Sequence, residues 1–237
     1  MKVSVVVPAF NEERLLAGSL AAVREAMSAF PQGELIVCDN NSTDRTAEIA
    51  RAAGASVVFE PVNQIARARN RGAAAASGDW LVFVDADSYP SRELFADALQ
   101  AMRRGDCLAG GATIGFDTRD PYVRFWIAFW NGLSRRARWM AGSFIFCEAA
   151  AFRAIGGFDE ALFAGEEIDL SRRLKRVARA QGKQVVILDR HPLYTSDRKI
   201  HLYTKREHAV FMLKTLLFAG RNLRDRKACY AWYDGRR

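Results

Sequence analysis

The sequence predicts a layered, Rossmann-like α/β fold in which helices flank a mostly parallel central sheet. Between residues 2 and 103, short apolar runs alternate with helical segments four times, which is typical of parallel strands joined by right-handed crossovers. Polar residues follow three of these runs, at 8–12, 39–42 and 85–87. Because parallel strands bring their carboxyl ends to one edge of a sheet, we expect these residues to meet in a ligand site.

The strands of the first half are short runs rich in β-branched or aromatic residues, and the helices have apolar residues near helical spacing. The expected strands cover residues 2–7, 35–38, 56–59 and 81–84. The expected helices begin at Asn11, as the cap, and at about Thr43, and then cover residues 66–76 and 92–103. Pro8 ends the first strand, and Gly54 ends the second helix.

The second half is less regular. We expect strands over 108–116, 143–147 and 184–188, and helices over 149–155 and 166–180. Residues 120–140 are aromatic and basic, which predicts an amphipathic helix or a lid, and residues 205–219 are amphipathic as well. The expected organisation is one domain over 1–197, with halves at about 1–104 and 105–197, and a basic, amphipathic helical tail over 198–237.

The composition suits one large domain, since half of the 237 residues are hydrophobic and can form a sizeable core. The four cysteines are scattered without metal-ligand or redox spacing, so we expect a reducing, cytoplasmic setting. The N-terminus lacks the features of a signal peptide, and no apolar run approaches the roughly 18 residues of a membrane span.

Positive charge is concentrated in the tail. Residues 1–197 hold 24 Lys and Arg against 24 Asp and Glu, whereas residues 198–237 hold 11 against 3, so the tail supplies the net charge of +8. A basic tail suits anionic lipid, nucleic acid or a phosphorylated substrate, and a solvated basic surface explains it equally well. No nucleic-acid-binding motif accompanies it, so we expect no nucleic-acid partner.

Two acids, Asp85 and Asp87, follow the buried strand at 81–84. Carboxylates at a strand end are hard oxygen ligands, suited to Mg²⁺ or Mn²⁺ that carries a phosphate. The first two strand ends can hold a nucleotide. Backbone groups after Pro8 and the side chains of Glu12, Asp39 and Asn40 would contact it. The alternative for the acid pair is a turn that caps the next helix through Ser88 or Ser91.

A second acid cluster begins the helix at 166–180 and consists of Glu166, Glu167 and Asp169. The helix dipole favours the charged form of acids in a first turn, and an ionised carboxylate in a sugar-sized cleft can deprotonate an acceptor hydroxyl. Stabilisation of the helix N-terminus alone explains the cluster as well.

Five segments appear in the order found in family 2 of the inverting glycosyltransferases, which have the GT-A fold. They are VVVPAFNEE (5–13), CDNNSTDRT (38–46), ARNRGAAAASGDWLVFVDADS (68–88), GGFDE (156–160) and GEEIDLSRRL (165–174). The chain resembles this family over roughly residues 1–190. The resemblance implies a nucleotide-diphospho-sugar donor and a divalent cation, Mn²⁺ or Mg²⁺, as cofactor.

The resemblance also implies roles for particular residues. Those that match nucleotide-binding positions are Pro8, Ala9, Phe10, Glu12, Asn40, Arg67 and Arg69. Asn40 stands where the family usually has an Asp that contacts the nucleobase, which leaves the identity of the nucleobase open. Asp87 matches the direct metal ligand, and Asp85 the residue that supports ribose or metal-bound water. Glu167 matches the Asp that acts as base, and the role could instead pass to Glu166 or Asp169.

Three further features are weaker. His191 can complete the metal shell, bind phosphate or be an ordinary turn histidine. Thr195, Ser196, Arg198 and Lys199 can close over the diphosphate or form a solvated loop. The tryptophans at 126, 130 and 139 can stack on an acceptor sugar, enter a membrane interface or pack in the core.

We therefore expect a metal-dependent, inverting hexosyltransferase-type enzyme. It would move a sugar from a UDP-sugar, or a GDP-sugar, to an acceptor hydroxyl on a glycan or a lipid-linked molecule. The expected location is the cytoplasm, with peripheral contact to the inner face of the membrane through 120–140 and 205–219. The rival interpretations are an inactive binding module at a membrane or partner surface, and a sugar nucleotidyltransferase.

Overall fold

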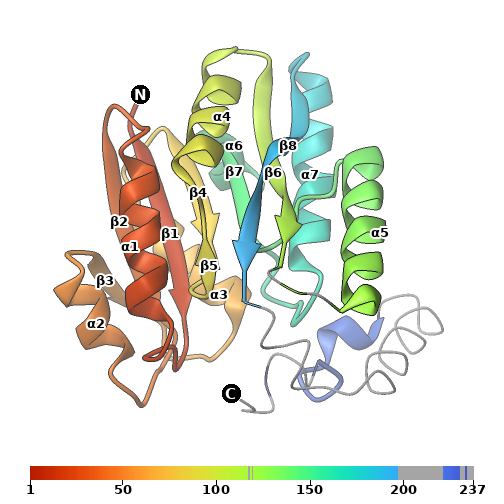
Figure 1. Ribbon diagram of the computed structural model, residues 1–237. Coiled ribbons are helices and arrows are strands. Elements are labelled where there is room, and N and C mark those ends of the chain that lie inside the picture. Colours follow the sequence, from red (N-terminus) through yellow and green to blue (C-terminus); the bar gives the residue numbers. More distant parts are fainter. Residues whose placement is uncertain (117, 119, 197–220, 230–232, 234–237) are drawn as a thin grey trace.

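The computed structural model describes residues 1–116, 118, 120–196, 221–229 and 233, and its strands form one mixed, largely parallel sheet (Figure 1). The strand order is β3-β2-β1-β4-β7-β6-β8-β5. The strands are β1 (Val3–Ala9), β2 (Gly33–Asp39), β3 (Ser56–Phe59), β4 (Trp80–Val84), β5 (Ser88–Tyr89), β6 (Cys107–Gly115), β7 (Phe144–Glu148) and β8 (Gln184–Thr195). The predicted fold class is confirmed.

The first four strands are parallel, and β1 lies between β2 and β4. The chain first winds outward from β1 to β2 and β3, and then returns to add β4 on the other side of β1. The strand order thus reverses at β1, and such switch points open a crevice beyond the carboxyl ends of the strands. The residues that follow β1 and β4 therefore flank the crevice.

The second half adds strands in both directions. β7 is antiparallel to both β4 and β6, whereas β8 is parallel to β6. β8 is longer than the expected strand at 184–188, because its pairing with β6 shifts register between Ala112 and Ile114 and then resumes at Leu193 and Tyr194. The last residues of β8 also pair with β5, directly after the acid pair.

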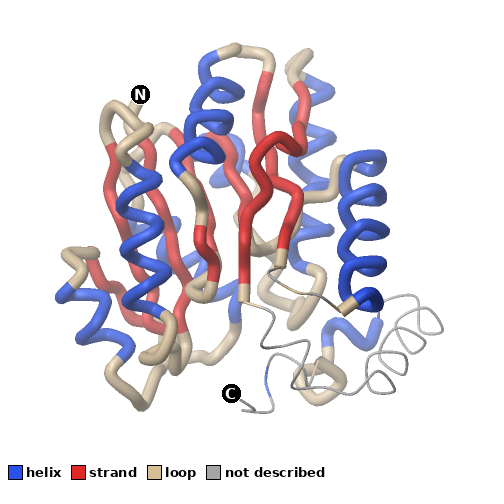
Figure 2. Tube along the Cα trace, viewed as in Figure 1, coloured by secondary structure: helices blue, strands red, loops and turns tan. Residues whose placement is uncertain are grey.

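Helices cover both faces of the sheet (Figure 2). The helices are α1 (Leu16–Met27), α2 (Thr46–Ala52), α3 (Ile65–Ala75), α4 (Arg92–Arg103), α5 (Pro121–Ala137), α6 (Ala149–Ala154) and α7 (Glu166–Ala180). One core packs α1, α2 and α4 against the sheet, and the other packs α3, α6 and α7 against its opposite face. Alternate residues of β1, such as Val5 and Val6, face opposite cores, as strand geometry requires.

Gly72 allows α3 to pack directly on the sheet. A Cβ added at this residue would lie 2.4 Å from a methyl carbon of Val6 and 3.8 Å from the Cβ of Cys38. Real Cβ atoms do not approach another carbon so closely, so only glycine fits. The close contact of α3 with β1 also fixes the position of Arg69, which lies about one turn before Gly72 in α3.

Two helices begin later than expected. Asn11 does not cap α1, which begins at Leu16. Instead its backbone adopts a φ of 51°, a left-handed conformation that Asn tolerates better than most residues. α2 begins at Thr46 rather than at Thr43, because Asp44 accepts a hydrogen bond from the Thr46 amide. Ser91 does cap α4, by accepting from the Leu94 amide.

No helix within the described part of the chain is long and apolar enough to cross a membrane. The expected amphipathic segment at 205–219 lies outside the described residues. Of the expected helical tail, the structure describes 221–229, which includes a 3-10 turn (Arg221–Arg224), and residue 233.

Candidate functional site

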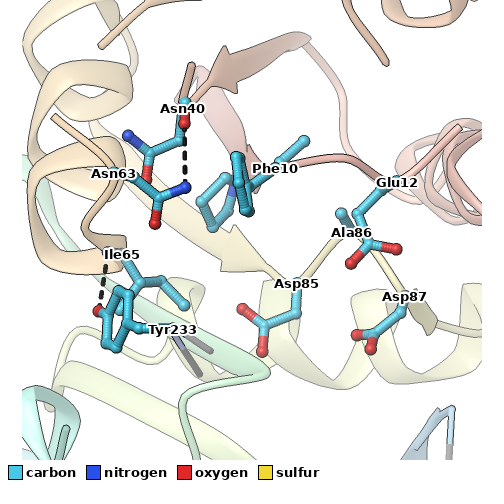
Figure 3. A pocket seen from close by; sticks show the side chains of 11 residues that line it. Phe10, Glu12, Asn40, Asn63, Ile65, Asp85, Ala86, Asp87 and Tyr233 are labelled. Atoms are coloured by element: carbon cyan, nitrogen blue, oxygen red, sulfur yellow. Dashed lines mark hydrogen bonds between the residues drawn. The ribbon is translucent and has the colours of Figure 1, made fainter. Parts of the chain in front are cut away.

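A pocket opens at the switch point, beyond the ends of β1, β2 and β4 (Figure 3). The strand ends bring together residues far apart in the sequence. The lining residues are Pro8, Ala9, Phe10, Glu12, Asn40, Asn63, Ile65, Asp85, Ala86, Asp87 and Tyr233. The sequence predicted seven of these as nucleotide or metal ligands, so most of the expected residues do gather in one place.

Hydrogen bonds tie the loop after β1 to the loop after β2. Asn11 Oδ1 accepts from the Thr43 amide at 2.8 Å, and the Asn11 amide donates to Ser42 Oγ at 3.0 Å. The Glu12 amide donates to Thr46 Oγ1 at 2.8 Å. These bonds hold the buried Glu12 at the rim of the pocket, and they give the polar strand ends a fixed shape before any ligand binds.

Asp85 and Asp87 stand at the end of β4, and both carboxylates point into the pocket (Figure 3). Asp87 is buried, and Thr195 Oγ1 lies 3.4 Å from its Oδ1. Among the described residues, no group of three metal-ligating side chains is close enough to hold an ion by itself. Two carboxylates nevertheless fit Mg²⁺ or Mn²⁺, because such ions take one or two carboxylates and fill the other positions with waters and substrate phosphates.

A second cleft adjoins the first and shares Ile65, Asp85 and Asp87 with it. Its other walls come from the end of β6, from α5, from the loop before β7 and from the start of α7. The remaining lining residues are Arg69, Ile114, Phe116, Trp130, Ala141, Gly142, Ser143, Ala164, Gly165, Glu166, Glu167, Thr195 and Ser196. The acid pair therefore lines the same cleft as Glu166 and Glu167 of the second acid cluster.

Arg69 forms ion pairs with one residue of each acid cluster. Its Nη2 lies 2.9 Å from Asp85 Oδ1, and its Nη1 lies 2.7 Å from Glu166 Oε1. Nη2 also donates to the Gly142 carbonyl at 2.9 Å. Only 1% of Arg69 is exposed, and its guanidinium holds carboxylates at the wall of the cleft. Its expected contact with the nucleotide stays a prediction.

The three acids of the second cluster have different surroundings. Glu166 is buried and paired with Arg69, and Asp169 pairs with Arg173 at 2.6 Å and lines a separate pocket. Asp169 therefore lines a different pocket from Glu166 and Glu167. Glu167 faces the cleft, and no ion pair within the described part of the chain engages its carboxylate.

The pKa of Glu167 is raised to about 8 from its usual 4.5. Burial is the main cause, because it disfavours the charged form, and the negative charge of Glu166 adds to it, while Arg69 acts in the opposite direction. A carboxyl group with a pKa near neutrality can accept a proton more readily than an ordinary glutamate.

Asn40 lines the switch-point pocket, and its side chain also has partners within the protein. The Asn40 amide group donates to the carbonyls of Glu60 and Val62 and accepts from the Gln64 amide. Its side chain therefore shapes the loop after β3. An Asp in this place could not donate to those two carbonyls.

Asp39 and Arg67, two further residues expected to contact the nucleotide, have partners within the protein. Asp39 is buried and accepts from the Ser42 amide at 3.0 Å, so it stabilises the turn after β2. Arg67 points to Glu160, with 3.2 Å between Nη2 and Oε2. Both residues support the walls of the site.

His191 lies in β8 and not at the acid pair. Its Nδ1 is 2.9 Å from Asp97 Oδ2 on α4, on the far part of β8 from Thr195. The expectation that His191 completes the metal shell is therefore wrong. Thr195 and Ser196 do line the second cleft, whereas Arg198 and Lys199 lie outside the described residues.

The three tryptophans have three different environments. Trp130 lines the second cleft, Trp126 is exposed on α5, and the Trp139 ring lies 5.5 Å from the guanidinium carbon of Arg172. Only Trp130 is placed to meet a molecule in the cleft.

Sequence reasoning missed four residues that line the first pocket: Asn63, Ile65, Ala86 and Tyr233. Asn63 lies in the loop that Asn40 shapes, and Ile65 begins α3 directly after that loop. The loop could have been suspected because it follows a strand end. Tyr233 lies in the C-terminal segment, and no local pattern indicated it.

The strand order and the helices on both faces of the sheet match the GT-A fold. The model of glycosyl transferase family 2 matches residues 4–155, more than half of the chain, so this chain belongs to that family. It is similar to validoxylamine A glucosyltransferase of Streptomyces hygroscopicus subsp. jinggangensis, with 27% identity over 72% of this chain and 50% of the relative. It is also 31% identical to dolichol-phosphate mannosyltransferase of Pyrococcus furiosus, over 47% of this chain and 33% of that protein.

Solved structures share the fold. The mannosyltransferase PcManGT of Pyrobaculum calidifontis, in complex with GDP-Man and Mn²⁺, has a TM-score of 0.68 and 19% identity, over 95% of this chain and 63% of that one. Glucosyl-3-phosphoglycerate synthase of Mycobacterium tuberculosis, in complex with Mn²⁺, UDP-glucose and phosphoglyceric acid, has a TM-score of 0.65 and 21% identity, over 96% and 79%. The chain spans only 26% to 50% of the length of the first curated relatives it matches.

Proposed function

We propose that this protein is a metal-dependent, inverting glycosyltransferase that uses a nucleotide-diphospho-sugar. The observation that carries the proposal is the continuity of the two pockets: Asp85 and Asp87 face both, and Glu167 faces the second. A donor in the first pocket would direct its diphosphate to the acid pair and its sugar toward Glu167. The similar structures that hold GDP-Man or UDP-glucose with Mn²⁺ support this reading.

In the proposed reaction, the acceptor hydroxyl gives its proton to Glu167 as its oxygen bonds to the anomeric carbon. The bond from that carbon to the diphosphate breaks on the opposite face, so the configuration inverts. Asp87, supported by Asp85, would hold Mn²⁺ or Mg²⁺, which supplies positive charge to the diphosphate. Trp130 would present a flat ring to a sugar in the cleft.

The first test is thermal unfolding of the purified protein with UDP, GDP, CDP and dTDP, each with and without Mn²⁺. We expect a metal-dependent rise in melting temperature with one nucleotide, and UDP is the favoured one, since a ligand at 100 times its Kd stabilises the native state by about 2.7 kcal/mol. Asp87→Ala should abolish the metal-dependent part of the rise.

A matched control for this test is Asp169→Ala, which removes an acid that faces away from the cleft. It should keep the metal-dependent rise. If Asp87→Ala keeps it too, the acid pair is not the metal site. If the wild type responds to no nucleotide, the protein is better described as a binding module. If the protein hydrolyses a sugar nucleotide without an acceptor, the interpretation as an inactive binding module is excluded.

We further propose that the acceptor is lipid-linked and that α5 meets the surface of an anionic membrane. Three rings on α5 are exposed, Phe125 by 63%, Trp126 by 44% and Phe129 by 54%. Arg124 precedes them, and the exposed Arg135, Arg136 and Arg138 follow. An apolar strip with flanking arginines suits the interface of a bilayer that carries negative charge.

Sedimentation with vesicles tests this surface. We expect binding to vesicles of phosphatidylglycerol and phosphatidylcholine that decreases at high salt, and little binding to phosphatidylcholine alone. The double variant Phe125→Ser, Phe129→Ser should reduce the bound fraction severalfold, whereas Phe59→Ser, which removes an exposed ring from β3, should not. Equal binding by both variants would contradict the role of α5.

A further inference from the structure

The described C-terminal segment, residues 221–229, docks on the loop that precedes α7. The Phe163 amide donates to the Leu223 carbonyl at 2.7 Å, and Arg224 Nη2 lies 3.6 Å from Asp159 Oδ2. Cys229 is fully buried. Backbone, charge and burial thus place this segment against the loop 159–165, whose last residue, Gly165, is the N-cap of the helix that carries Glu167.

Tyr233 extends this docking into the pocket at the switch point. Its ring meets the Phe163 ring edge to face, with 5.5 Å between centroids, and its hydroxyl accepts a hydrogen bond from the Ile65 amide at 3.3 Å (Figure 3). The same ring lines the pocket with Pro8, Phe10 and Asn63. It is therefore held from both sides, by the loop before α7 and by the first turn of α3.

We propose that Tyr233 is a donor-binding residue whose ring forms one wall of the nucleoside part of the pocket. The proposal rests on the function given above. Every base has a flat face that an aromatic ring can pack against, and such contacts contribute substantially to nucleotide affinity. Figure 3 shows Tyr233 on the same side of the pocket as Asn63 and Ile65, with Asp87 on the opposite side, so the nucleoside is the part of a donor that we expect Tyr233 to meet.

The wall that Tyr233 forms is supported by the loop before α7, because the Phe163 ring that meets Tyr233 lies two residues before Gly165, the N-cap of α7. The C-terminal segment is then part of the donor site as well as a basic extension.

The test uses calorimetric titration of the full chain with UDP and GDP plus Mn²⁺, and with UMP and GMP without metal. For the nucleotide that binds the wild type, Tyr233→Ala should weaken the diphosphate and the monophosphate alike, by about tenfold. Asp87→Ala should weaken only the diphosphate with Mn²⁺. Tyr233→Phe keeps the ring and should stay within about threefold of the wild type. Phe59→Ala, which removes an exposed ring from β3, should change neither affinity.

The outcomes separate this inference from the function on which it rests. If Tyr233→Ala binds with unchanged affinity, or if Tyr233→Phe loses as much affinity as Tyr233→Ala, the Tyr233 ring does not form a wall of the nucleoside site. Either result would leave the proposed donor site itself intact. Failure of the wild type to bind either diphosphate would overturn both. In steady-state kinetics, Tyr233→Ala should raise the KM for the donor by about tenfold and change kcat far less, which a general loss of folded protein would not do.

Discussion

Glu167→Gln is expected to lower kcat by about 100- to 10,000-fold, the range typical for loss of a general base. Gln has nearly the same shape as Glu and cannot accept the acceptor's proton. The measurement is turnover of the donor identified by thermal unfolding. Nucleotide affinity should be unchanged, because Glu167 lines the second cleft and not the switch-point pocket. Glu167→Asp, which restores the residue usual in the family, should retain much more activity than Glu167→Gln.

The pH profile provides an independent check on the same residue. With its pKa raised to about 8, Glu167 is mostly protonated at neutral pH. For a base that must be ionised, kcat/KM should rise with pH about tenfold per unit and level off above about 8. Glu167→Gln should remove this rise, and Asp169→Asn, on the other side of α7, should keep it. A profile that is flat from pH 6 to 9 would contradict Glu167 as the base.

Stability should change with pH in the opposite direction. The folded state favours protonated Glu167, whereas the unfolded chain ionises near 4.5. The stabilisation from the protonated form is complete below pH 4.5 and is lost as pH rises through about 8. Relative to Glu167→Gln, the wild type should therefore lose stability over that window, which chemical denaturation at a series of pH values would measure.

The strand ends were predictable because each depends on a short local pattern. An apolar run followed by Pro8, or by Asp85 and Asp87, specifies a strand and its end within a few residues. The direction of a strand depends on what it pairs with. The sequence predicted that residues 143–147 return to the sheet, but nothing local specified that β7 is antiparallel to both neighbours.

The roles inside the site depend on contacts between distant residues. Glu167 and Asp169 are two apart on a helix, so their side chains point about 200° apart around the axis. Only one can face the cleft, and packing of α7 on the sheet decides which one. Arg69 and Glu166 are 97 residues apart, and their ion pair exists only once α3 and α7 lie on the same face. Tyr233 reaches the pocket in the same non-local way.

Arg69→Met is expected to lower the free energy of unfolding by about 3–5 kcal/mol, the usual cost of removing one partner from a buried ion pair. Met fills much of the same volume, so the loss would come mainly from Asp85 and Glu166, which would keep their charges without a cation. The measurement is urea unfolding at neutral pH. Adding Glu166→Gln to Arg69→Met should recover part of the loss, because one of the two unpaired charges is then gone.

Arg67→Met is the matched control, since it lies two residues earlier in the same helix and removes the same charge. Its pair with Glu160 is partly exposed on both sides, so the loss should be at most about 1 kcal/mol. If both variants lose the same amount, the stabilisation belongs to α3 in general and not to the bridge between the acid clusters.

Arg69 and Glu166 should also shift the pH profile in opposite directions. Burial is the main reason that the pKa of Glu167 is high, but Glu166 raises it further and Arg69 lowers it. Arg69→Met should therefore move the midpoint of kcat/KM above about 8, and Glu166→Gln should move it below. A purely structural role for the pair would reduce activity in both variants without moving the midpoint. Opposite shifts would show that Arg69 and Glu166 together set the proton affinity of the base.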